Sequence, residues 1–289
     1  MISFIKFIQF IFGLIFRLPA TLAIHSMRLA AEAVYRIARL TSIRKTVIAN
    51  MRRLLPNSAA APLADKLLRN FSHSIFEVLC APFFQPKHLE MICKVSGTEN
   101  IDLALANCKG VIFLIMHTGN YELIPAALTS RGYHITSILK APHNDPLFKL
   151  LHRSRSYCGT EQINVLEGNM YRQALQALAR NRCVCLLIDT GALEGKHEIF
   201  QFLGKRVPVA TGWLALAQRS GAPIIPLISK RDGDKVAFSI GDPLTVKKDN
   251  REEILRRVGA IFENFIKNHP EQWGIFLNEY ETKRMVEGK

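Results

Sequence analysis

The chain has 289 residues, of which 48% are hydrophobic, and 38 Lys and Arg against 24 Asp and Glu give a net charge of +14. This length supports one large core, or a core with a small helical lobe. The charge predicts an acidic partner such as anionic lipid, an acidic carrier protein, a phosphorylated substrate or nucleic acid. The six cysteines are scattered without paired metal-ligand spacing, which excludes a zinc site or disulfide framework as the organising feature and favours a reducing compartment.

The amino-terminal stretch, residues 2–24, is about long enough to span a bilayer, but Lys6, Gln9 and Arg17 interrupt it. Charge inside the apolar region argues against a cleaved signal peptide. We expect an uncleaved anchor over residues 1–25 that either spans the membrane or lies in its interface. Basic residues between positions 28 and 45 follow this segment, which places the main body on the cytoplasmic side.

Residues 31–86 have helical periodicity, with one helix ending at Pro56 and another running from Pro62 to about Cys80. After Gly97, helical and strand patterns alternate. The predicted helices are 99–107, 120–131, 144–157, 169–180, 211–220 and 251–268, and the predicted strands are 111–116, 133–139, 162–166, 183–188, 223–228 and 236–240. This alternation predicts an α/β fold whose mixed, mostly parallel sheet is flanked by helices. We expect a helical lobe over residues 26–96 and an α/β core over residues 97–289.

A histidine directly follows the most apolar of these strands. Val111 to Met116 reads as a strand buried on both faces, and His117 stands at its carboxyl end, the edge at which open α/β sheets bind ligands. Glu122 lies five residues on, in the first turn of the expected helix, where it could reach back to the imidazole. The pair is typical of a general base with an orienting carboxylate; no Ser or Cys nucleophile adjoins it, which favours direct attack by an acceptor hydroxyl. A histidine that only supports the fold is the alternative.

Further candidates stand in loops after the later strands. Lys140 ends one strand, and Arg155 lies late in the next helix, where cationic groups could hold phosphate. Asp189 ends strand 183–188 and so faces the same sheet edge as His117. Gly204 and Thr211 flank a basic turn and a helix start, where Thr211 is an N-cap or a phosphate contact. Solvated charges and structural caps are the alternatives for all of these.

Several blocks in order resemble the bacterial lipid A biosynthesis (lauroyl/myristoyl) acyltransferases, within the lysophospholipid acyltransferase superfamily. His117-Thr-Gly-Asn-Tyr-Glu122 is similar to their His-x-Gly-Asn-Trp-Glu block. The other matching blocks begin at Val47, Lys140, Asp189, Phe202, Ala222 and His269. Two departures stand out: Tyr121 replaces Trp, and the Trp-x-His-x-Arg pattern that follows the last block in the family is absent after Trp273.

The resemblance implies an O-acyltransferase on the cytoplasmic face of the bacterial inner membrane. It implies acyl carrier protein or acyl-CoA as donor, and the hydroxyl of a lipid A precursor or related glycolipid as acceptor. His117 and Glu122 would be the catalytic pair. Substrate-binding roles would fall to Asn120, Lys140, Arg155, Asp189, Gly204 and Thr211. No metal or other cofactor is implied, since thioester acyl transfer needs only a base, an oxyanion donor and positioning.

Three other functions remain open. The acceptor could be a lysophospholipid or another membrane lipid, and His117 could instead activate water in a hydrolase. The charge also suits a non-catalytic protein that binds a membrane surface or nucleic acid. The basic residues are dispersed without the aromatic interleaving of a single-strand binder, which argues against a nucleic-acid partner.

Overall fold

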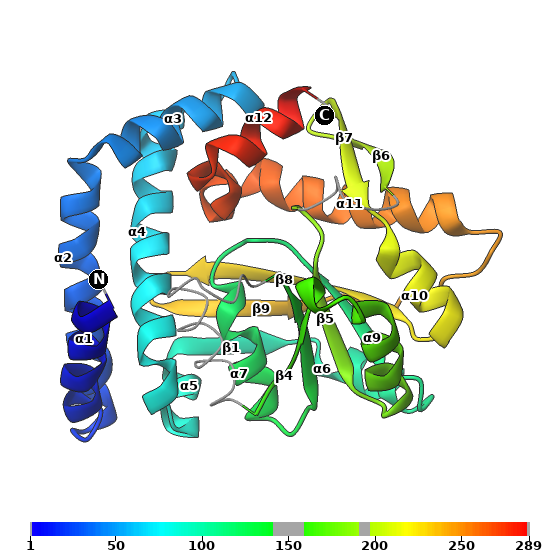
Figure 1. Ribbon diagram of the computed structural model, residues 1–289. Helices are drawn as coiled ribbons and strands as arrows, with labels where there is room; N and C mark the ends of the chain where they lie inside the picture. Colours follow the sequence, from blue (N-terminus) through cyan, green and yellow to red (C-terminus); the bar gives the residue numbers. More distant parts are fainter. Residues whose placement is uncertain (1, 141–158, 191–196, 288–289) are drawn as a thin grey trace.

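The computed structural model describes residues 2–140, 159–190 and 197–287. Within these ranges, seven strands form one sheet in the order β1-β9-β8-β2-β5-β3-β4 (Figure 1). The strands are β1 (Cys93–Ser96), β2 (Val111–Ile115), β3 (Ile135–Leu139), β4 (Glu161–Asn164), β5 (Cys183–Leu187), β8 (Ile224–Asp232) and β9 (Lys235–Ile240). All neighbouring pairs are parallel except β8 and β9. The predicted fold class, an α/β protein with a mostly parallel sheet flanked by helices, is confirmed.

The central strand β2 is buried along its whole length, between β5 and β8. Its side chains alternate between two apolar clusters because successive residues of a strand face opposite ways. Ile112 and Leu114 belong to one cluster, whereas Val111 and Phe113 belong to the other. The run of apolar residues is thus explained by two covered faces, each of which needs its own set of side chains.

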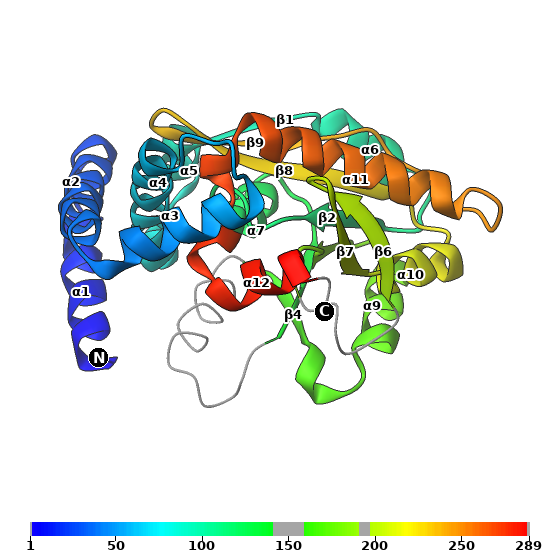
Figure 2. The same cartoon turned by 90° about the horizontal axis from the view of Figure 1, so that it is seen from above.

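Helices cover both faces of the sheet. One face carries α9 (Met170–Ala179), α10 (Gly212–Ser220) and α11 (Arg251–Asn268), and the other carries α5 (Pro86–Ile92), α6 (Thr98–Leu105) and α7 (Ile124–Thr129). The carboxyl-terminal segment adds η5 (Pro270–Gln272), η6 (Gly274–Leu277) and α12 (Glu279–Glu287). Figure 2 shows α12 beside α3 (Ser42–Leu54), at the opposite end of the chain.

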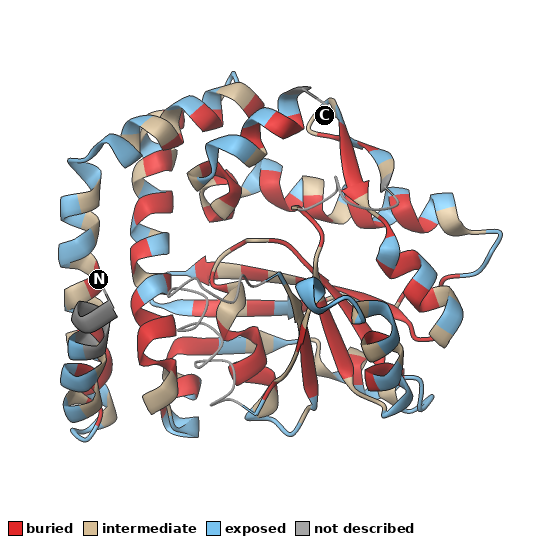
Figure 3. Cartoon of the chain, in the orientation of Figure 1, coloured by how far each residue is buried: buried red, intermediate tan, exposed pale blue. Residues whose placement is uncertain are grey.

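Four helices precede the sheet: α1 (Ile2–Ile15), α2 (Ala20–Arg39), α3 and the 21-residue α4 (Ala60–Cys80). In Figure 1, α4 stands between α1 and α2 on one side and the sheet on the other. The inner sides of α1 and α2 share an apolar cluster with the sheet, whereas their outer sides are largely exposed (Figure 3). Among the residues that the structure describes, no helix combines the length and apolar character needed to cross a membrane.

A separate hairpin joins β6 (His197–Phe202) to β7 (Lys205–Ala210). Leu203 and Gly204 form its two-residue turn with φ values of 53° and 71°. Two consecutive residues of positive φ are what a type I′ hairpin turn requires, and glycine adopts this conformation without steric cost. Gly204 therefore has a structural reason to be glycine, independent of any ligand.

Most elements of the sheet lie within a few residues of their predicted positions. The sequence did not predict the β6–β7 hairpin or β1, which is only four residues long and pairs with β9 at the edge of the sheet. The strand β1 begins at Cys93, before residue 97, where we expected the α/β core to begin. The predicted helix 120–131 is divided into a 3₁₀ turn, η2 (Tyr121–Leu123), and α7. The predicted helix 144–157 lies outside the described residues.

Candidate active site

His117 lies just past the carboxyl end of β2, and Asp189 lies at the same level just past β5. The parallel register pairs Ile115 with Leu187. His117 and Asp189 each lie two residues further along the chain, so they meet at the sheet edge. Nδ1 of His117 lies 2.6 Å from Oδ1 of Asp189, and the backbone N–H of His117 donates to Oδ2 of Asp189 at 2.9 Å. Because a carboxylate only accepts, Nδ1 carries the proton and Nε2 is the basic nitrogen.

A third donor reaches the same carboxylate. The indole Nε1–H of Trp273 donates to Oδ2 of Asp189 at 2.9 Å. The next residue, Gly274, donates its backbone N–H to the carbonyl of His117 at 2.7 Å. The segment that follows α11 therefore contacts both members of the His117–Asp189 pair.

The two side chains lie in contact at a largely enclosed place, which shifts both pKa values. Burial by itself lowers the pKa of His117, but the charge and hydrogen bond of Asp189 outweigh it, and the pKa lies above its ordinary value. Burial by itself raises the pKa of Asp189, but the charge of His117 and the hydrogen bonds from His117 and Trp273 outweigh it, and the pKa lies below its ordinary value. Asp189 is thus ionised at neutral pH, and its negative charge favours the protonated form of His117.

Glu122, the predicted orienting carboxylate, is not the group at Nδ1 of His117. That place belongs to Asp189. The physical reason is local: the chain after Asn120 makes the 3₁₀ turn η2 before α7 begins, so Glu122 is not in the first turn of a regular helix. Glu122 still acts on the imidazole at a distance, because its charge is among those that raise the pKa of His117.

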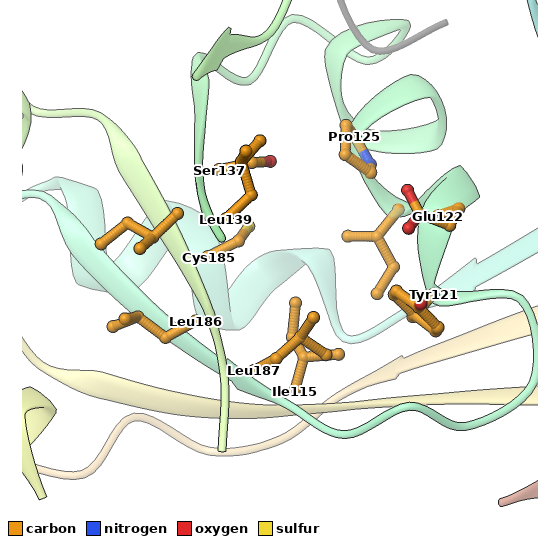
Figure 4. A pocket seen from close by; sticks show the side chains of 11 residues that line it. Ile115, Tyr121, Glu122, Pro125, Ser137, Leu139, Cys185, Leu186 and Leu187 are labelled. Carbon is orange, nitrogen blue, oxygen red and sulfur yellow. The ribbon is translucent and has the colours of Figure 1, made fainter. Parts of the chain in front are cut away.

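A small cavity lies at the carboxyl ends of β2, β3 and β5. Its volume is about 50 Å³. Figure 4 shows Glu122 and Tyr121 on one side of it, opposite Leu139, Cys185 and Leu186. The ring of Tyr121 also meets the imidazole of His117 edge to face, with ring centroids 4.8 Å apart. The cavity is therefore mostly apolar, with a carboxylate in its wall, and one of its lining side chains contacts His117.

Asn120, predicted to bind substrate, lies instead in a buried polar network. Its side-chain amide donates to Oε2 of Glu77 at 2.7 Å, and Glu77 is paired with Arg231 through two hydrogen bonds of 2.9 and 2.6 Å. All three side chains are buried. This network fixes the turn that follows His117 to α4 and β8, so we assign Asn120 a role in holding the turn.

At Gly119, the turn after His117 packs closely against the backbone of β8. Its φ is +55°, and a Cβ atom there would lie 2.6 Å from the carbonyl oxygen of Ser229. Real side chains do not tolerate that distance, so the Gly-Asn part of the motif is explained by backbone packing.

The remaining predicted residues are distributed around this edge and beyond it. Lys140 is exposed directly after β3, and Arg155 lies outside the described residues. Gly204 forms the turn of the hairpin, and Thr211 is buried directly before α10. The structure thus brings His117, Asp189 and Glu122 to one edge. In residues 2–140, 159–190 and 197–287, no group of three or more His, Cys, Asp or Glu side chains could hold a metal ion.

Trp273 and its neighbour Gln272 also contact the site, and the sequence analysis gave neither of them a role there. Gln272 accepts the backbone N–H of Gly119 through its carbonyl at 2.9 Å. Both residues belong to the block His269-Pro-Glu-Gln-Trp273, which resembles a block of the family. The spacing of that block does not show that it contacts strand ends more than 80 residues earlier in the chain.

Comparisons with known proteins identify the family of this chain. The sequence profile of the bacterial lipid A biosynthesis acyltransferases matches residues 2–282, and the chain belongs to that family. It is therefore an O-acyltransferase, a class whose reaction requires an acyl donor, and its family is membrane-associated and acts on lipid.

Individual relatives are distant. The chain is 22% identical over 231 residues to a phosphatidylinositol mannoside acyltransferase of Mycobacterium tuberculosis, which covers 78% of this chain and 73% of the relative. It is 22% identical over 222 residues to a lipid A biosynthesis acyltransferase of Haemophilus influenzae, covering 76% and 69%. The crystal structure of the 1-acyl-sn-glycerophosphate acyltransferase PlsC of Thermotoga maritima aligns with 83% of this chain and 99% of that chain, at 16% identity and a TM-score of 0.41.

Proposed function

We propose that the protein moves a fatty acyl chain from the thioester of acyl carrier protein or coenzyme A to a hydroxyl group of a membrane glycolipid, with His117 as the general base. The observation that carries the proposal is the 2.6 Å contact between Nδ1 of His117 and Oδ1 of Asp189 at the open edge of the sheet. A fixed tautomer with a basic Nε2 is what proton abstraction from an alcohol needs.

The reaction needs no covalent intermediate on the protein. Nε2 of His117 takes the proton of the acceptor hydroxyl while its oxygen attacks the thioester carbonyl. The tetrahedral intermediate then expels the thiolate, which takes the proton back from the imidazolium. Asp189 stabilises that imidazolium during the interval and keeps the ring from rotating.

Glu122 and the apolar cavity support the same reaction. The charge of Glu122 makes His117 a stronger base, and its position in the cavity wall is suitable for a contact with the incoming hydroxyl. The apolar side chains of Ile115, Leu139 and Leu187 give the first carbons of the acyl chain a dry surface. Glu122 is therefore a second catalytic residue, which raises the pKa of His117 and contacts the acceptor hydroxyl.

The donor carries phosphate in either form, and basic residues of the chain suit it. Lys140 is exposed directly after β3, whose last three residues, Ser137 to Leu139, line the cavity. We assign Lys140 and Arg155 to the phosphate groups of donor or acceptor. The net charge of +14 also favours encounter with an acidic carrier protein.

A sugar-bearing lipid is the acceptor class that the relatives support, because two of them are named for phosphatidylinositol mannoside and for lipid A. A lipid A precursor is the leading candidate. The altered sequence after Trp273 leaves room for a different headgroup, and a lysophospholipid is the main alternative.

The amino-terminal helices suit a place on the cytoplasmic face of the bacterial inner membrane. Exposed apolar side chains follow the outer sides of α1 and α2, namely Phe7, Phe10, Ile11, Leu14, Leu18, Leu22, Leu29 and Ile37. Residues 1–54 contain nine Lys or Arg and one acid, Glu32, which is a net charge of +8. An apolar stripe flanked by positive charge is typical of a helix pair that lies in the interface of an anionic bilayer.

Product identification tests the proposal. The purified protein is incubated with acyl-carrier-protein and CoA thioesters and with a lipid A precursor or a lysophospholipid, and lipids are analysed by mass spectrometry. We expect acylated lipid A precursor from the unaltered protein and from the control His134→Ala, whose histidine is exposed at the opposite end of β3. His117→Ala should form no product.

Each other outcome identifies a different function. If only the lysophospholipid is acylated, the acceptor is a lysophospholipid and the proposed mechanism is unchanged. Free fatty acid without acylated lipid indicates a hydrolase. Binding of lipid without any turnover, from a folded protein, contradicts the proposal and supports a surface-binding role.

A further inference from the structure

Trp273 packs among aromatic side chains and also donates a hydrogen bond to Asp189. The residue is fully buried, and its ring packs edge to face against Phe202 and Phe276, with centroids 5.8 and 5.3 Å apart. Two aromatic neighbours at these angles fix the plane of the indole. The fixed plane directs Nε1–H at Oδ2 of Asp189, 2.9 Å away.

We propose that Trp273 is a positioning residue for acyl transfer: its indole N–H holds the Asp189 carboxylate ionised and aimed at His117. This inference rests on the proposed function of His117. Asp189 can be an anion in its buried place only because donors replace the water it has lost. Oδ1 receives the imidazole N–H, and Oδ2 receives the backbone N–H of His117 and the indole N–H.

The indole anchors Asp189 independently of His117, which the other two donors cannot do. Both of those belong to His117, so they move together with the residue that Asp189 has to orient. Trp273 comes from a different part of the chain, and it gives the carboxylate a fixed point outside the pair. Its neighbours reinforce this arrangement, because Gly274 holds the carbonyl of His117 and Trp273 forms a backbone bridge with Thr118.

The substitution Trp273→Phe tests the N–H because phenylalanine keeps an aromatic ring and removes the donor. We expect kcat to fall roughly 10- to 100-fold, the range for losing a hydrogen bond to a charged group, while KM for donor and acceptor stays within about twofold, since the indole is buried below the pair. The matched control is Trp213→Phe. Trp213 is also buried, on α10, and its indole N–H has no hydrogen-bond partner among the described residues.

A spectroscopic measurement on the unaltered protein serves where the variant does not fold. The chain has two tryptophans, so ¹⁵N-labelled tryptophan gives two indole N–H signals. We expect one of them to shift with pH at the midpoint of the acidic limb of kcat/KM, because protonation of His117 changes the charge pattern on Asp189. His117→Ala should abolish that shift, and the Trp213 signal should not follow it.

The outcomes separate this inference from the proposed function. If His117→Ala is inactive, but Trp273→Phe keeps the unaltered kcat or neither indole signal titrates with the activity, Trp273 only fills space and the inference is overturned. If His117→Ala transfers acyl groups normally, the proposed function itself fails. A loss of kcat equal in Trp213→Phe and Trp273→Phe would also contradict the inference, because it would reflect packing alone.

Discussion

A single carboxylate decides which nitrogen of His117 can act as a base. Asp189 follows β5, the neighbour of β2, and accepts from both the ring and the backbone of His117. The ring therefore cannot rotate without breaking a hydrogen bond inside the protein. The charge of Glu122 raises the pKa of the same ring, so we expect the two acids at this edge to have different tasks.

The raised pKa of His117 gives a prediction for the pH dependence of catalysis. A base must be neutral to act, so kcat/KM should rise with pH through a midpoint above about 6.5, the ordinary value for imidazole. In Asp189→Asn the anion is gone and burial dominates, so the midpoint should move to lower pH. A pH–rate profile of both proteins measures this, and an unchanged midpoint in the variant would show that Asp189 does not set the pKa.

The same shift has a consequence for stability. A histidine whose pKa is higher in the folded than in the unfolded protein stabilises the fold fully below the unfolded value, and this contribution is lost as pH rises through the folded value. We expect the difference in unfolding free energy between the unaltered protein and His117→Ala to be larger at pH 5.5 than at pH 9. Thermal unfolding across this range checks the sign, and a difference that grows towards high pH would contradict it.

At the scale of elements, a buried ion pair connects α4 to β8 beneath the site. Glu77 and Arg231 form two hydrogen bonds, and Asn120 joins them from the turn after His117. Such a pair adds little to net stability, but removing one partner leaves an uncompensated buried charge. The pair fixes the turn that follows His117, through Asn120.

Arg231→Met should therefore lower the free energy of unfolding by about 3 to 5 kcal/mol. The exposed pair of Arg180 with Glu161 provides the comparison, and Arg180→Met should cost no more than about 1 kcal/mol. Urea unfolding followed by circular dichroism measures both. In the double variant Glu77→Leu with Arg231→Met we expect much of the loss to be recovered, whereas equal losses in the single and double variants would argue against the charge explanation.

The elements that could be predicted from the sequence are those with local signals. The buried run of β2, the histidine at its end and the helix over residues 251–268 all depend on short-range pattern and were found. The partner of His117 depends on which strands are neighbours, and spacing favoured Glu122 because it is close in sequence. The sequence predicted Asp189 at the same sheet edge as His117, but their contact depends on β5 being the neighbour of β2, and Trp273 reaches the site through a chain return, neither of which periodicity contains.

At the scale of the whole molecule, charge and apolar exposure gather at the amino-terminal helices. The outer sides of α1 and α2 expose large apolar side chains, and the first 54 residues hold +8 of the net +14. Both features point the same way, towards an anionic lipid surface. A lipid acceptor that stays in its bilayer would then need to move only a short way to reach the enzyme.

Replacing two exposed side chains of this face, in Phe10→Asp with Leu22→Asp, should weaken binding to vesicles that contain phosphatidylglycerol by at least about 100-fold, since each buried apolar side chain contributes roughly 1.5 to 3 kcal/mol. Leu103→Asp, at an equally exposed apolar residue on α6, is the control. Vesicle sedimentation measures the effect, and salt should weaken binding of the unaltered protein. Equal binding of all three proteins would place the membrane contact elsewhere.

The most direct test of the central claim compares the two carboxylates at the site. Acyl-transfer rates are measured by mass spectrometry at saturating donor and acceptor for Asp189→Asn and Glu122→Gln. In Asp189→Asn the backbone N–H of His117 keeps the amide oxygen, so the amide nitrogen faces Nδ1 and forces the wrong tautomer. We predict a loss of about 10⁴-fold, the size of the effect when an orienting carboxylate is changed to its amide, and a smaller loss in Glu122→Gln, which removes one of several charges that raise the pKa of His117. A larger loss in Glu122→Gln than in Asp189→Asn would contradict the assignment of Asp189 as the residue that holds the base.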